Sequence, residues 1–75
     1  MTVKEIHTAL ENGQIVHWEN SLYRVYLTPV RRSFQEHDLN HPTHLNGKMI
    51  EIICTNNHFG GLADIDELNA CYLAS

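Results

Sequence analysis

Residues 14–28 carry the sequence QIVHWENSLYRVYLT, in which two β-rich runs flank the turn formers Asn20 and Ser21. The runs extend over 14–19 and 22–28 and hold many β-branched and aromatic residues, which favour strands. Two such runs separated by two turn residues predict an antiparallel hairpin. Side chains in the second run alternate between two faces. One face holds Tyr23, Val25 and Leu27, and the other holds Arg24 and Tyr26.

A helix is predicted before this hairpin, over residues 3–12. Thr2 and Glu5 have the spacing of a capping box, in which each side chain accepts a hydrogen bond from the other residue's backbone N–H. Gly13 ends the helix, because glycine adopts the left-handed conformation of a helix C-terminus without steric conflict. One helical face carries the apolar residues Val3, Ile6 and Leu10, with His7 beside them.

Two further strands are predicted after the hairpin. The first covers residues 48–55 and follows the turn signal Asn46-Gly47. It is apolar on most of both faces, which predicts an interior position in a sheet. The second covers residues 59–63 and contains two adjacent glycines that mark a bulge or a bend. Residues 29–47, which precede these strands, are predicted to form an irregular loop.

The last segment repeats the capping pattern. Asp64 and Glu67 have the spacing of a second capping box, which opens a single helical turn through Leu68. Residues 71–73 follow as a short final strand or a tail.

These elements predict one α+β domain over residues 1–75, a small antiparallel SH3-like barrel that is partly open, with four or five strands and an N-terminal helix. A chain of this length buries about 60% of its surface on folding, enough for one thin core. The predicted core consists of Val3, Ile6, Leu10, Ile15, Trp18, Val25, Leu27, Ile50, Ile52, Leu62 and Leu68.

The net charge of −4 is placed unevenly along the chain. Residues 1–48 hold five Lys and Arg residues against five Asp and Glu residues, whereas residues 49–75 hold no Lys or Arg. The acids of this last third are Glu51, Asp64, Asp66 and Glu67. Such a segment repels a phosphate backbone and attracts a basic protein surface. The alternative is that these are ordinary solvated acids at a helix start.

The composition favours a soluble cytoplasmic protein. No run approaches the roughly 18 apolar residues of a membrane span, and the chain does not start like a signal peptide. Cys54 and Cys71 are too few for a disulfide-rich scaffold and are expected to be thiols among small core residues.

Three histidines, His37, His41 and His44, lie within eight residues and are the candidate ligands of a metal site. Pro42 breaks any helix that would align the first two, and no C-x2-C pair accompanies them. We therefore expect a polar loop with no metal and no other cofactor. Enzymatic activity is not expected either, because none of the common nucleophile, phosphate-loop or metalloprotease motifs is present.

A nucleic-acid interface is the alternative function. An aromatic and arginine-rich barrel face can stack bases and hold phosphates. The residues that would do this here are Tyr23, Arg24, Tyr26, Arg31 and Arg32. Only five Lys and Arg residues occur in an acidic chain, which makes this function less favoured.

The pattern Ile15-x2-Trp18-x-Asn20-x2-Tyr23-x-Val25, together with Ile50-x-Ile52 and Gly61-Leu62, resembles very short proteins encoded by phages and prophages. The resemblance covers residues 13–27 and 49–68, and the chain departs from it over 28–48. The resemblance implies an origin in a mobile genetic element. Several such proteins, anti-CRISPR proteins among them, block a host enzyme or defence complex, and the resemblance implies a similar role here.

The expected function is therefore that of a small non-catalytic protein that binds and blocks a host protein, such as a CRISPR-Cas complex. Loops on a rigid barrel are where binding groups usually lie. The expected contact residues are Asp64, Asp66, Glu67, Arg31, Arg32, Glu36 and Asp38. A homodimer is also compatible with the sequence.

Overall fold

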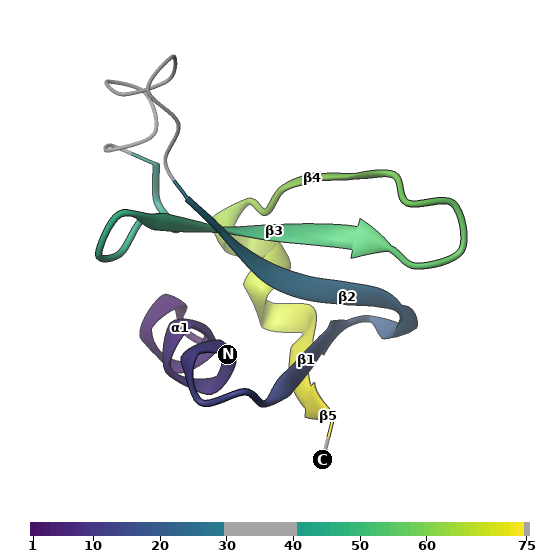
Figure 1. Cartoon of the computed structure of the whole chain (residues 1–75), viewed down its shortest axis with the longest axis horizontal. Helices are drawn as coiled ribbons and strands as arrows, with labels where there is room; N and C mark the ends of the chain where they lie inside the picture. The colour runs from purple at the N-terminus through teal and green to yellow at the C-terminus, as the bar shows by residue number, and fades with distance from the viewer. Residues whose placement is uncertain (30–40, 75) are drawn as a thin grey trace.

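The computed structural model describes residues 1–29 and 41–74 (Figure 1). Within these residues the chain forms an α-helix, five strands and a 3₁₀ helix. Their order is α1 (Val3–Glu11), β1 (Ile15–Trp18), β2 (Asn20–Pro29), β3 (Lys48–Cys54), β4 (Gly60–Leu62), η2 (Ile65–Ala70) and β5 (Cys71–Ala74).

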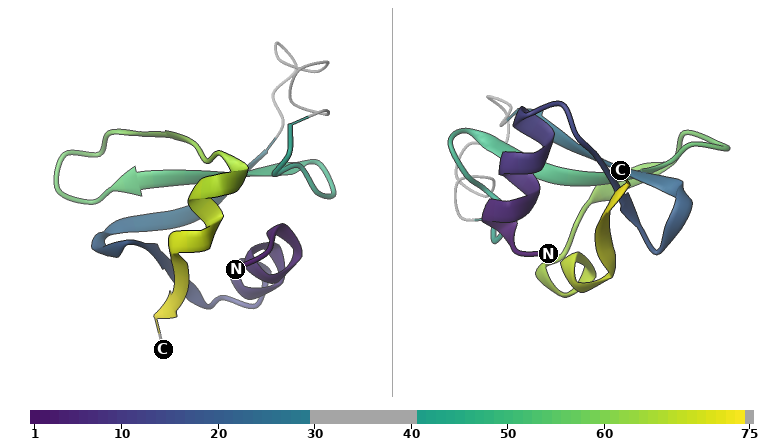
Figure 2. Two further views of the ribbon diagram at one scale, coloured as in Figure 1. Left: turned by 180° about the vertical axis from the view of Figure 1, so that it is seen from behind. Right: turned by 90° about the horizontal axis from the view of Figure 1, so that it is seen from below.

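The strands form one antiparallel sheet in the order β4-β3-β2-β1-β5. β5 pairs with β1, so the first and last strands of the chain are neighbours. β4 and β5 lie at the two edges, and η2 connects one edge to the other (Figures 1 and 2). Over the described ranges the sheet is not closed. The predicted α+β class is confirmed, and the predicted SH3-like barrel agrees with this open sheet only loosely.

The capping box at the start of α1 is confirmed. Glu5 N–H donates to Thr2 Oγ1 at 3.1 Å, and Thr2 N–H donates to Glu5 Oε1 at 2.8 Å. The bond from the Thr2 backbone lowers the pKa of the exposed Glu5 carboxyl below its usual range. The stabilisation that the ionised Glu5 carboxylate gives the helix start is therefore present at neutral pH and is lost as the pH falls through the lowered pKa. The helix ends at Glu11, one residue earlier than predicted, and Gly13 has a φ of 78°.

The core lies between α1, η2 and the inner face of the sheet. Its buried residues are Ile6, Ala9, Val16, Val25, Ile50, Ile52, Ala63, Leu68 and Cys71. Five predicted core residues are among them, and four others pack against this core while partly buried: Val3, Leu10, Trp18 and Leu27. The prediction is wrong for Ile15 and Leu62, which are 38% and 42% exposed. Side chains alternate along β1, so Val16 and Trp18 face inward and Ile15 faces outward.

The β1–β2 turn lies one residue earlier than predicted. Glu19 occupies it with a φ of 62°, and β2 already begins at Asn20. Asn20 Oδ1 accepts a hydrogen bond from Leu22 N–H at 2.9 Å, and the pairing register shifts between His17 and Trp18. Asn20 therefore contributes to the turn, as predicted, but it is already the first residue of β2, where the pairing with β1 is irregular.

The turn at Asn46-Gly47 is confirmed. Both residues have positive φ angles, 53° and 79°, as in the two-residue turns that favour this pair. Leu45 and Lys48 exchange two backbone hydrogen bonds of 2.8 and 3.1 Å across the turn. β3 then lies between β2 and β4, the interior position that its two apolar faces predict.

A buried polar network joins α1 to the segment before β3. His7 is 2% exposed, and its Nε2 donates to the Thr43 carbonyl at 2.9 Å. The buried Thr43 hydroxyl accepts from Ile50 N–H at 3.2 Å and donates to His41 Nδ1 at 2.9 Å. The amphipathic pattern of the helix shows that His7 lies beside the apolar face, but it does not reveal this partner 36 residues away.

We expect His7→Leu to lower the free energy of unfolding by about 1–3 kcal/mol, because the buried Thr43 carbonyl would lose its donor. Urea denaturation measures this loss. His7→Gln is the matched control, since its amide can still donate, and it should be less destabilising. Equal losses in the two variants would contradict the role assigned to this hydrogen bond.

Candidate functional site

Three of the acidic residues predicted to bind a partner lie at the start of η2. Asp64 and Asp66 are exposed, and Glu67 is half-buried. Glu67 Oε1 accepts a hydrogen bond from Asp64 N–H at 2.9 Å, which closes the first turn of the 3₁₀ helix. Glu67 therefore also stabilises this turn, and Asp64 is the N-cap residue of η2. Asp66 is the cleanest probe of binding, and variants of Asp64 are compared with the parent by thermal denaturation.

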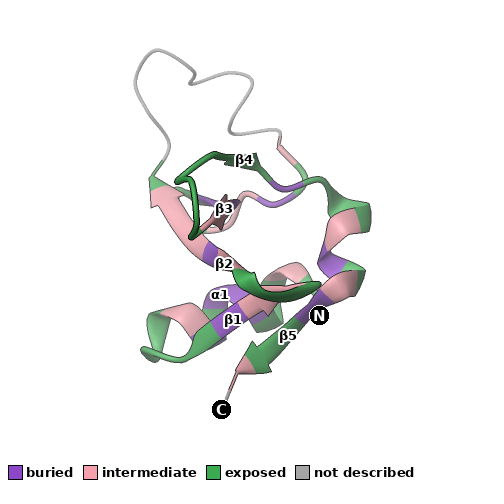
Figure 3. Ribbon diagram, turned by 90° about the vertical axis from the view of Figure 1, so that its right-hand side faces the viewer, coloured by how far each residue is buried: buried purple, intermediate pink, exposed green. Residues whose placement is uncertain are grey.

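A hollow of about 240 Å³ opens beside Glu67, among residues of β1, β2, β3, β4 and η2. We call it the mouth, and it is lined by Trp18, Tyr23, Ile52, Phe59, Gly60, Gly61, Leu62 and Glu67. Figure 3 shows β4 exposed along its length and η2 beginning in exposed residues. Concave sites with apolar and aromatic walls and a few polar groups are where proteins commonly bind ligands.

Aromatic side chains dominate the wall of the mouth. The rings of Trp18 and Tyr23 meet edge to face, with their centroids 5.0 Å apart and their planes at 84°. Phe59 lies in the β3–β4 connection and is 78% exposed. Trp18 Nε1 is buried and has no acceptor within residues 1–29 and 41–74. The mouth thus combines three rings and one carboxylate, and none of the residues that line it within 1–29 and 41–74 is cationic.

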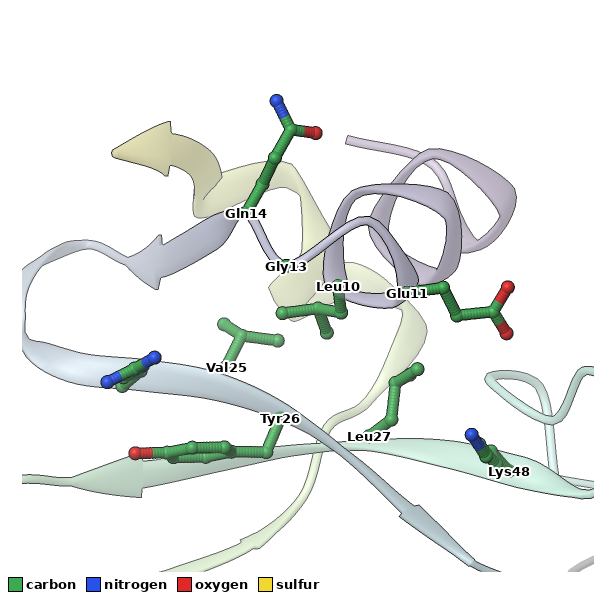
Figure 4. Close-up of a pocket in the computed structure, with 9 residues that line it drawn as sticks. Leu10, Glu11, Gly13, Gln14, Val25, Tyr26, Leu27 and Lys48 are labelled. Carbon is green, nitrogen blue, oxygen red and sulfur yellow. The ribbon is translucent and has the colours of Figure 1, made fainter. Parts of the chain in front are cut away.

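A second cleft, of about 460 Å³, lies between the end of α1 and β2 (Figure 4). Arg24 and Lys48 line it, and the Arg24 guanidinium lies 5.2 Å from the centre of the Tyr26 ring, a cation–π distance. Figure 4 shows Glu11 on the helix side of this cleft and Lys48 on the strand side. The cleft therefore carries charges of both signs.

The predicted nucleic-acid face is divided by the fold. Arg24 and Tyr26 share one face of β2, as predicted, and both line the second cleft. Tyr23 lies on the opposite face, against Trp18 and the core. The structure therefore does not bring Tyr23 together with the other two residues.

Several predicted site residues lie outside the described part of the chain, namely Arg31, Arg32, Glu36, His37 and Asp38. The other two candidate metal ligands are each used locally. His41 Nδ1 accepts from Thr43 N–H at 3.2 Å, and His44 Nε2 accepts from Gly47 N–H at 3.2 Å. Among the described residues, no group of three His, Cys, Asp or Glu side chains is arranged to hold a metal ion. Cys54 and Cys71 are free, and burial raises the pKa of the Cys71 thiol.

Comparisons of the chain with protein-family models, with curated proteins and with solved structures find no match. No helix in the described ranges is long and apolar enough to cross a membrane. The case for a function therefore depends on the geometry of the mouth and the second cleft.

Proposed function

We propose that this protein is a non-catalytic binding module that docks on a basic surface of another protein through the mouth and the start of η2. The main support is an aromatic hollow lined by Glu67, with the exposed Asp64 and Asp66 within three residues of Glu67 along the chain. The segment that holds these acids, residues 49–75, contains no Lys or Arg. Negative charge at the rim of such a site speeds the approach of a basic partner. Aromatic side chains are enriched among the residues that anchor interfaces.

The narrower proposal concerns the target. The resemblance of the hairpin and of the segment 50–62 to phage and prophage proteins supports a host protein as the partner, with a nucleic-acid-handling defence complex such as CRISPR-Cas as the leading class. Complexes of this kind carry positively charged channels for nucleic acid, which an acidic surface can occupy. On this proposal the protein acts in the cytoplasm of the host cell and inhibits by occupying the surface.

The proposal is tested by capture from host lysate with three immobilised forms of the chain. The first is the parent, the second carries Asp64→Lys with Asp66→Lys, and the third carries Glu11→Lys with Glu19→Lys. Each variant replaces two exposed acids with two lysines, so the two variants change the net charge equally. We expect a protein that is retained by the parent and by the Glu11/Glu19 variant and is lost from the Asp64/Asp66 variant. Equal retention by both variants would contradict the proposal.

A second candidate function is anion or nucleic-acid binding at the second cleft, favoured by Arg24 over Tyr26 and by Lys48 nearby. Fluorescence anisotropy with a labelled single-stranded oligonucleotide separates the two candidates. Binding that weakens steeply with salt and disappears in Arg24→Gln would favour the second function. On our preferred proposal the parent protein shows no such binding.

A further inference from the structure

We propose that the mouth receives a lysine or arginine side chain of the docked protein and holds its cationic group between the aromatic rings and the Glu67 carboxylate. This inference rests on the proposed function and adds the chemical group that enters the hollow. Its support comes from the arrangement of the rings, the local charge and the space left by one glycine.

The rings provide the first argument. A cation is attracted to the face of an aromatic ring when it lies within about 6 Å of the ring centre. Trp18 and Tyr23 come from different strands and stand nearly perpendicular, with their centroids 5.0 Å apart, so together they form a corner. Phe59 adds a third ring at the exposed rim. Rings set at right angles around a hollow are suited to a cationic side chain, whose apolar stem also packs against them.

The charges provide the second argument. Glu67 lines the mouth, and Asp64 and Asp66 stand exposed close by along the chain. No Lys or Arg occurs from residue 49 to residue 75, so the nearby sequence offers no cation to neutralise these acids. An anionic ligand is disfavoured here, and a cationic one is favoured both by the carboxylates and by the ring faces.

The third argument is the room left at Gly61. Gly61 pairs directly with Ile52 across β3 and β4, and opposed residues in an antiparallel pair project to the same face. Ile52 is a buried residue that lines the mouth, so a side chain at Gly61 would project toward the mouth as well. A Cβ placed at Gly61 meets no atom within 4 Å. The mouth is therefore open where any other residue would begin to fill it.

The test uses the full chain and the indole N–H of Trp18, the single tryptophan, as an NMR reporter. The probes are the N-acetyl methylamides of lysine, arginine and trimethyllysine, and a neutral trimethyllysine isostere with carbon in place of nitrogen. We expect saturable shifts of the Trp18 signal with the cationic probes and binding about threefold to tenfold weaker with the neutral isostere. The tighter of the lysine and arginine probes identifies the side chain that the mouth prefers.

Two variants complete the test. Gly61→Val should fill the mouth and abolish the shifts while leaving the melting temperature close to that of the parent. Phe59→Ala should weaken binding of the cationic probes about twofold to fivefold without loss of stability, because its ring is mostly exposed. Equal binding of the neutral isostere, or parental binding by Gly61→Val, would overturn the inference.

The outcomes separate this inference from the docking proposal. If no cationic probe shifts the Trp18 signal while the Asp64/Asp66 variant still loses a captured protein, docking is supported and the cation-binding mouth is refuted. If the probes bind in the mouth while the Asp64/Asp66 variant retains every captured protein, the mouth is supported and the docking proposal is refuted.

Discussion

Ile50→Ala should lower the free energy of unfolding by about 2–5 kcal/mol, the largest stability effect that we expect. Ile50 is fully buried on β3, and truncation removes its contacts and leaves a cavity between the sheet and α1. The free energy of unfolding of a domain this small is at most about 5–15 kcal/mol, so the loss should be visible as a large fall in the urea midpoint.

Ile15→Ala is the matched control for this loss. Ile15 is 38% exposed on the outer face of β1, so the same truncation should cost less than about 1 kcal/mol. If Ile15→Ala is as costly as Ile50→Ala, β1 has the opposite face in the core and the register of the structure is wrong.

Gly60→Ala is the second variant with a large expected effect, a loss of about 1–3 kcal/mol. A Cβ at Gly60 would overlap the Ile52 carbonyl and the Ile53 side chain, so β4 would have to move away from β3. Since β4 forms one wall of the mouth, we also expect the Trp18 indole signal to shift in this variant. Thermal denaturation and one NMR spectrum measure both effects.

Gly61→Ala is the control, because the neighbouring glycine has open space at its Cβ position. Its stability should stay within about 0.5 kcal/mol of the parent. A loss in Gly61→Ala equal to that in Gly60→Ala would show that the glycines are needed for backbone flexibility and not for the close approach of β4 to β3.

The features that the sequence predicts well are those set by neighbouring residues. The capping box of Thr2 and Glu5 spans four residues, and the turn at Asn46-Gly47 spans two, so both are found where the pattern places them. The burial of Ile15 was predicted wrongly because the run 14–19 is apolar at adjacent positions, and its periodicity does not fix which face is inside. The pairing of β1 with β5 determines which face of β1 is buried, and this pairing joins residues more than 50 positions apart in the sequence.

The mouth was not predicted for the same reason. The acids were found from their charge and spacing, but the rings beside them come from three separate segments. Trp18 and Tyr23 meet only because the bulged turn at Glu19 folds β2 back on β1, and Phe59 joins them through the pairing of β4 with β3. Three isolated aromatic residues in an 8%-aromatic sequence give no local signal of such a cluster.

The most direct test of the docking proposal is the association rate of the captured partner with the parent and with the Asp64→Lys, Asp66→Lys variant at two ionic strengths. We predict that the double variant associates at least about tenfold more slowly at low salt and that the difference shrinks at about 0.5 M salt, because surface charges are then screened. Association and affinity equal to those of the parent at low salt would contradict the proposal and would show that these acids are only a solvated helix start.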